Sequence, residues 1–125
     1  MELNALKILV CDDSILIRKK LKDCVQSFGC SQVFEALNGQ EAIDLYKEHG
    51  PDLVFMDIVM PVKGGIEAVT EIIKFDKSAK VVMASSSGTK THLKKALEAG
   101  AYDFIQKPFE EAQIKNILLS FKGGV

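Results

Sequence analysis

Short apolar runs alternate with amphipathic stretches along nearly the whole chain. Within the runs, apolar residues follow one another almost without interruption, which is typical of strands that are buried on both faces of a sheet. Between the runs, apolar residues recur at helical spacing and charged residues fill the other faces. The predicted strands are KILVC (7–11), QVFEA (32–36), LVFM (53–56), KVVMAS (80–85) and YDFI (102–105).

The amphipathic stretches predict five helices, one after each strand. Strands that alternate with helices form βαβ units, and such units build a parallel sheet with helices on both faces. Right-handed crossovers then place the C-terminal ends of all strands at one edge of the sheet, where doubly wound folds bind ligands. The pattern therefore predicts an α/β doubly wound fold for a single domain, residues 1–125.

Composition narrows the class of protein. The chain has 125 residues, of which 47% are hydrophobic and 26% charged, and its net charge is −1. No global basic field favours nucleic acid or an anionic membrane, and no apolar stretch approaches the roughly 20 residues of a transmembrane helix. The cysteines Cys11, Cys24 and Cys30 form no C-x-x-C pair, so we expect small core residues in a reduced, cytoplasmic protein.

Polar residues follow four of the predicted strands. Asp12 and Asp13 follow the first, Asp57 the third, Ser85 ends the fourth, and Lys107 follows the fifth. In a parallel sheet these residues converge on one edge. With no His or Cys among these five residues, the carboxylate oxygens suit Mg²⁺, and less well Ca²⁺ or Mn²⁺. A carboxylate can also be the nucleophile in phosphoryl transfer, with a lysine and a hydroxyl close to the transferred group.

Each of these residues has an ordinary structural alternative. The adjacent acidic pair precedes a helix and could cap it. Asp57 could accept hydrogen bonds from loop amides, Ser85 could be a loop hydroxyl, and Lys107 could be solvated. The site is inferred from the whole set at matching strand ends, and no single residue decides it.

The stretches around these residues resemble the receiver domain of bacterial response regulators. The resemblance covers essentially the full chain and implies a CheY-like (flavodoxin-like) sheet of five parallel strands in the order 2-1-3-4-5, with five helices. It rests on ILVCDDS (8–14), Asn38-Gly39, LVFMDIVMP (53–61) followed by Gly65, VVMASS (81–86) and ALEAGAYDFIQKPF (96–109).

The resemblance implies a role for each residue at the strand ends. Asp57 would be the phosphoacceptor. Asp13, Asp57 and the backbone carbonyl of Val59 would ligate Mg²⁺ directly, and Asp12 would act through a metal-bound water. Lys107 would pair with the phosphoryl oxygens.

The resemblance also implies a switch and a cis peptide bond. Ser85 would be the switch hydroxyl and Phe104 the switch aromatic residue, and Lys107-Pro108 would be cis. Many chemotaxis receivers have tyrosine at the position of Phe104, so rotation here would depend on packing alone. Family members often have polar residues at the positions of Val59 and Ser87, which flank the path of the hydrolytic water. We therefore expect slow self-dephosphorylation.

The implied function is a phosphoacceptor in two-component, chemotaxis-type signalling, which catalyses only its own phosphorylation and dephosphorylation. We expect a cytoplasmic monomer without an output domain, which receives phosphoryl from a sensor histidine kinase. Its output would pass through a protein partner, such as a flagellar switch or a histidine phosphotransferase, at the face of helix four, strand five and helix five. Lys90, Lys94 and Lys95 suggest an acidic partner or a solvated helix face.

Three alternatives remain at this stage. A phosphorelay intermediate would have the same strand-end residues. A Mg²⁺-dependent aspartyl-phosphate phosphatase commonly has a second Asp two residues after the first, where this chain has Val59. A flavodoxin-like cofactor binder would share the layers of the fold, but acidic strand ends would repel the flavin phosphate.

Overall fold

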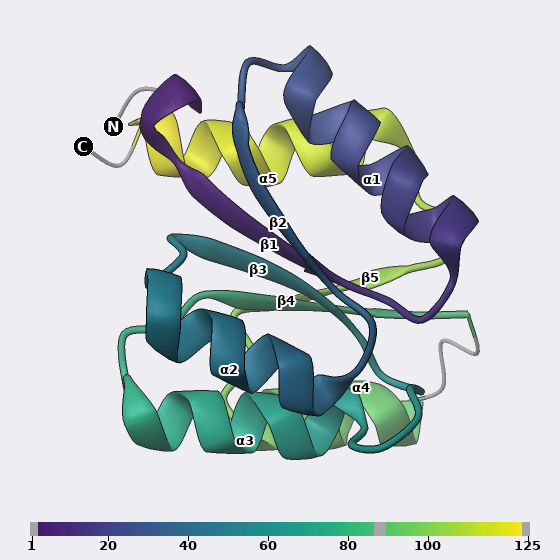
Figure 1. The fold of residues 1–125 in the computed structure, drawn as a ribbon. Coiled ribbons are helices and arrows are strands. Elements are labelled where there is room, and N and C mark those ends of the chain that lie inside the picture. The colour runs from purple at the N-terminus through teal and green to yellow at the C-terminus, as the bar shows by residue number, and fades with distance from the viewer. Residues whose placement is uncertain (1–2, 87–89, 124–125) are drawn as a thin grey trace.

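The computed structural model describes residues 3–86 and 90–123 and shows a central sheet between two layers of helices (Figure 1). A short 3-10 helix, η1 (Leu3–Ala5), precedes the first strand and was not predicted. The strands are β1 (Lys7–Cys11), β2 (Gln32–Ala36), β3 (Leu53–Asp57), β4 (Val81–Ser85) and β5 (Asp103–Gln106). The helices are α1 (Ile15–Ser27), α2 (Gly39–His49), α3 (Gly65–Phe75), α4 (Lys90–Glu98) and α5 (Glu111–Gly123).

The sheet is parallel throughout and has the order β2-β1-β3-β4-β5, which confirms the predicted fold class and strand order. Helices α1 and α5 cover one face, and α2, α3 and α4 cover the other (Figure 1). Strand bounds differ slightly from the predicted ones. β5 begins at Asp103 and continues to Gln106, because Gln106 still pairs with Ser85 of β4.

The apolar core has two parts, one on each face of the sheet. Successive strand residues point to opposite faces, so Ile8 and Val10 of β1 pack under α1 and α5, whereas Leu9 and Cys11 pack under the other helices. β3 and β4 are buried along their whole length, as their continuous apolar runs predict. All three cysteines are buried and unbridged, which confirms that they are core residues.

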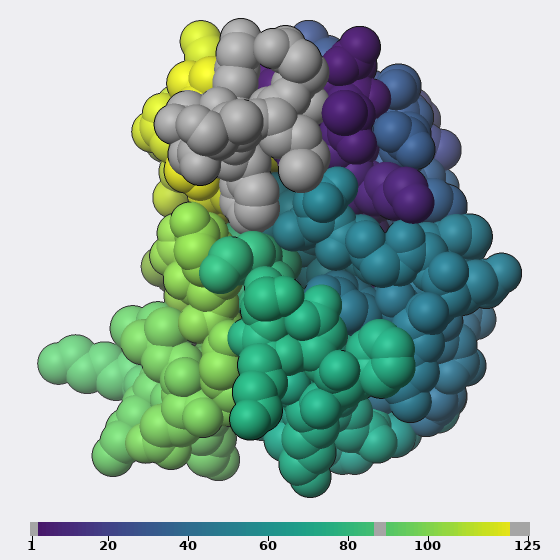
Figure 2. All heavy atoms as spheres, turned by 90° about the vertical axis from the view of Figure 1, so that its left-hand side faces the viewer, coloured from purple at the N-terminus to yellow at the C-terminus, as the bar shows by residue number. Residues whose placement is uncertain are grey.

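The two ends of the parallel strands lie at opposite edges of the molecule. The C-terminal ends of the strands and the N-terminal ends of the helices share one edge, which holds the predicted site. The opposite edge, which faces the viewer in Figure 2, consists of the C-terminal ends of helices and the turns that lead into strands. Among the described helices, none is both long enough and apolar enough to cross a membrane.

Candidate functional site

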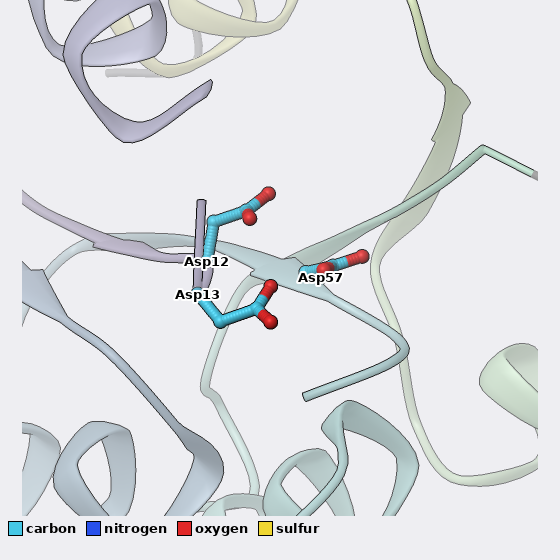
Figure 3. A group of neighbouring side chains, drawn as sticks. All are labelled: Asp12, Asp13 and Asp57. Carbon is cyan, nitrogen blue, oxygen red and sulfur yellow. The ribbon is translucent and has the colours of Figure 1, made fainter. Parts of the chain in front are cut away.

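Three carboxylates converge where β1 and β3 end (Figure 3). Asp12 and Asp13 directly follow β1, and Asp57 is the last residue of β3. One carboxylate oxygen from each lies within 4.8 Å of the other two. Asp12 and Asp57 are buried, with 3% and 8% of their surface exposed, whereas Asp13 is open to solvent. The parallel topology therefore brings these residues together as the sequence predicts.

Lys107 reaches the same cluster from the turn after β5. Its ammonium lies 2.5 Å from Asp12 Oδ2 and 3.2 Å from Asp57 Oδ1. Its side chain is only 12% exposed, so it is not an ordinary solvated lysine. The turn is held by a hydrogen bond from the Lys107 amide to the carbonyl of Ser85, 2.9 Å long, and the Lys107-Pro108 peptide bond is cis.

The electrostatics of the site depend on burial and on an excess of carboxylates over positive groups. Burial raises the pKa of Asp57, and the neighbouring Asp12 carboxylate raises it further, while Lys107 opposes both effects. Burial alone would lower the pKa of Lys107, but the hydrogen bond to Asp12 and the charge of Asp57 outweigh burial and raise it. One ammonium thus faces three carboxylates, which leaves the cluster an attractive site for a cation.

The donor set fits a divalent hard cation. The three candidate ligands are carboxylates, and two of them, Asp12 and Asp57, are largely shielded from solvent. Mg²⁺ binds commonly through one or two carboxylates plus waters and phosphate oxygens. Asp12, Asp13 and Asp57 could hold such an ion here.

The other predicted residues lie on β4, on β5 and in the loop after β3. Ser85 is buried at the end of β4, one residue beyond Ala84, which pairs with Asp57. Phe104 in β5 is half-buried and packs against the core part beneath α2, α3 and α4. Val59 is 69% exposed in the loop after β3. Ser87 lies outside the described residues.

Two contacts at the site were not predicted. The Arg18 guanidinium donates to the backbone carbonyl of Asp12, with a distance of 2.9 Å. The Cys11 thiol lies 3.3 Å from the sulfur of Met60, in the loop after β3. Arg18 looks like a residue of a solvated helix face in the sequence, and no local pattern signals either contact.

Comparison with known proteins agrees with this geometry. The family profile of the response regulator receiver domain matches residues 8–119. A chemotaxis protein CheY from Thermotoga maritima is 42% identical over 112 residues, which cover 90% of this chain and 93% of the relative. A chemotaxis protein CheY from Bacillus subtilis is 44% identical over 108 residues, covering 86% and 90%.

A solved structure is similar in both fold and sequence. The structure of a CheX–CheY–BeF3–Mg²⁺ complex from Borrelia burgdorferi aligns with a TM-score of 0.87 and 36% identity. The alignment covers 93% of this chain and 88% of that one.

Proposed function

Since the chain belongs to the response regulator receiver family, we propose that it is a chemotaxis-type phosphoacceptor in which Asp57 receives a phosphoryl group from a sensor histidine kinase. A protein of this kind is a signalling phosphoacceptor and not an enzyme that turns over a small-molecule substrate. The observation that supports the proposal most directly is Lys107, whose ammonium lies between the carboxylates of Asp12 and Asp57.

In the proposed transfer, a carboxylate oxygen of Asp57 attacks the phosphorus of a phosphohistidine. The new P–O bond forms as the P–N bond breaks, and the electron pair stays on the departing imidazole. Lys107 stays close enough to neutralise part of the charge that spreads over the transferred group. Asp57 pairs with Ala84 of β4, and the preceding residue, Met56, pairs with Cys11 of β1. This pairing supports a nucleophile that is oriented before the donor arrives.

The proposed cofactor is Mg²⁺, for which Mn²⁺ or Ca²⁺ could substitute. Asp13, Asp57 and the backbone carbonyl of Val59 would be its protein ligands, and Asp12 would act through a bound water. When bound, the ion supplies positive charge to the phosphoryl oxygens. The set of three carboxylates around a single ammonium supports this assignment.

Phosphorylation adds up to two negative charges and strong acceptor oxygens at Asp57. Ser85 and Lys107 are the proposed partners of those oxygens, and Phe104 is the proposed aromatic switch. Their new interactions would shift an equilibrium between two states of the face formed by α4, β5 and α5. A groove of about 610 Å³ lies on this face between β5 and α5, and Tyr102, Phe104 and Ile117 are among its lining residues.

The proposed partners are a sensor histidine kinase and an output protein, in the cytoplasm, with the chain acting as a monomeric single domain. A flagellar switch or a histidine phosphotransferase would fit the output role. The Borrelia relative is found in a complex with CheX, which supports a protein partner for this chain too. Lys90, Lys94 and Lys95 are exposed on α4 and would favour an acidic surface.

The central test uses a small acyl-phosphate donor. Wild-type protein is incubated with Mg²⁺ and acetyl phosphate, and its intact mass is measured. We expect one phosphoryl addition that is absent from Asp57→Asn and that EDTA prevents. An adduct that persists in Asp57→Asn would refute the assignment of the acceptor. Phosphotransfer profiling against kinases and histidine phosphotransferases then separates an output regulator from a phosphorelay intermediate.

Slow loss of the phosphoryl group is a further part of the proposal. Val59 has no side-chain donor or acceptor to orient a hydrolytic water, and it is exposed two residues after Asp57. We expect Val59→Asn to accelerate the decay of labelled phosphoprotein. A rate that is unchanged or lower would show that this position does not set the lifetime. The matching role proposed for Ser87 concerns a residue outside the described part of the chain.

A further inference from the structure

The peptide group of Asp12 is held on several sides. Its amide donates to the carbonyl of Ala36 at the end of β2, with a distance of 3.2 Å. Its carboxylate accepts from the amide of Ser14 at 2.9 Å and from Lys107. Its carbonyl oxygen accepts from Arg18 Nη1, also at 2.9 Å. The turn between β1 and α1 is therefore held by contacts from outside the turn itself.

Arg18 makes this contact from within α1 and is itself anchored. Its side chain is only 12% exposed, and its Nε lies 3.3 Å from Glu35 Oε1 in β2. Lys22, one turn further along α1, pairs with the other oxygen of Glu35 at 3.2 Å. A guanidinium is planar and presents its donors in a fixed fork. Arg18 thus joins β2 to the Asp12 carbonyl in one defined geometry.

We propose that Arg18 is a positioning residue for the metal site and that it acts through the peptide plane between Asp12 and Asp13. The carbonyl of Asp12 and the amide of Asp13 belong to one rigid plane. A contact that holds the carbonyl oxygen therefore also restricts the positions of the Asp13 nitrogen and Cα. Asp13 is exposed, so no packing around its side chain holds the carboxylate in place. The peptide plane sets the position of the Asp13 backbone and the direction of its Cα–Cβ bond, and thereby the range of positions that its carboxylate can reach.

If Arg18 positions the site, its removal lowers the affinity for Mg²⁺, whereas the loss of its charge alone would raise that affinity. A positive guanidinium near three carboxylates weakens their attraction for a cation, so removal of its charge would by itself strengthen Mg²⁺ binding. Loss of positioning would weaken Mg²⁺ binding, because outer contacts that orient ligands commonly contribute about 10-fold or more to metal affinity. The direction of the change thus distinguishes the two effects.

The matched control is Lys22. Like Arg18, it contributes one positive charge from α1 and pairs with Glu35, but it is Arg18 that donates to the Asp12 carbonyl. Lys22→Met therefore repeats the loss of charge and of the Glu35 pair without touching the turn. Arg18→Lys gives the converse variant, which keeps the charge and loses the fixed fork.

The experiment is calorimetric titration of Mg²⁺ into wild type, Arg18→Met, Arg18→Lys and Lys22→Met. Urea unfolding in EDTA shows first which variants are folded in the titration buffer. We expect Arg18→Met to bind Mg²⁺ about 10-fold more weakly and Arg18→Lys at least about threefold more weakly, with Lys22→Met within about twofold of wild type. If Arg18→Met does not fold, Arg18→Lys and Lys22→Met decide the question.

Unchanged or tighter binding by the Arg18 variants would overturn the proposal, and so would an equal loss in Lys22→Met. The inference rests on the Mg²⁺ site of the proposed function, and the two can fail separately. If wild type binds Mg²⁺ and the Arg18 variants bind it equally well, only the role of Arg18 is wrong. If wild type does not bind Mg²⁺, the proposed metal site is wrong and the role of Arg18 falls with it.

Discussion

Val62 offers a direct test of how the loop between β3 and α3 is built. Its φ is 66°, which places a β-branched residue in the left-handed region of the backbone. Its side chain is 82% exposed, so little packing offsets the strain. The loop is held in place by neighbouring contacts, including a 2.9 Å hydrogen bond from the Gly39 amide to the carbonyl of Lys63. We therefore expect substitutions that suit a positive φ to stabilise the protein.

The size of the effect follows from two opposing contributions. A left-handed conformation costs an L-residue about 1–2 kcal/mol, and glycine avoids this cost. Glycine also gives the unfolded chain more freedom, which costs about 0.5–1 kcal/mol. Val62→Gly should thus raise the free energy of unfolding by about 0.5–1 kcal/mol. Val62→Asn should raise it by about 1 kcal/mol, because asparagine tolerates this region and remains less flexible than glycine.

Urea unfolding measures this change. With a slope of about 2 kcal/mol per molar, the midpoint should rise by about 0.3–0.5 M. Val59→Gly is the control, since Val59 is also exposed in this loop but does not have a positive φ. It should lower the midpoint through chain entropy. A Val62→Gly midpoint that falls together with that of Val59→Gly would refute the reasoning.

Two further predictions concern α3 and its end. A Cβ on Gly65 would lie 2.1 Å from the backbone oxygen of Asp57, so Gly65→Ala must displace α3 from β3 and should cost about 1–3 kcal/mol by urea unfolding; a loss below about 0.5 kcal/mol would contradict the close approach. Hydrogen bonds from Ser78 and Tyr46 hold the pKa of Asp76 below its usual range, so this carboxylate stabilises the fold above its unfolded pKa and the contribution is lost as pH falls through the folded value. Tyr46→Phe should therefore cost about 1 kcal/mol at pH 7 and less near pH 2, and an equal cost at both pH values would argue against this linkage.

The sequence is informative about the sheet because burial on both faces leaves a simple signal. The runs around Leu53 and Val81 are almost continuously apolar, and the structure buries β3 and β4 completely. Once the strands are parallel, their C-terminal ends must share an edge. The proximity of Asp12, Asp13 and Asp57 follows from topology and needs no detailed geometry.

Contacts that depend on tertiary placement could not be predicted in the same way. Arg18 lies on the same helix as several solvated cations, and only the position of β2 and of the first turn shows that it contacts a backbone carbonyl. The local sequence around Val62 does not indicate a positive φ, because the conformation depends on how the loop joins α3 and contacts the first residue of α2. The position of Lys107 was predicted, but its sharing between two carboxylates depends on where the chain turns after β5.

The bond between Lys107 and Asp12 joins residues 95 positions apart. It closes a loop from residue 12 to residue 107, and closing a longer loop costs more chain entropy. During synthesis Asp12, Asp13 and Asp57 leave the ribosome well before Lys107, which partly neutralises their charge. The positive charge that Lys107 brings to the carboxylates is therefore present only after the ribosome has made the chain as far as the turn after β5.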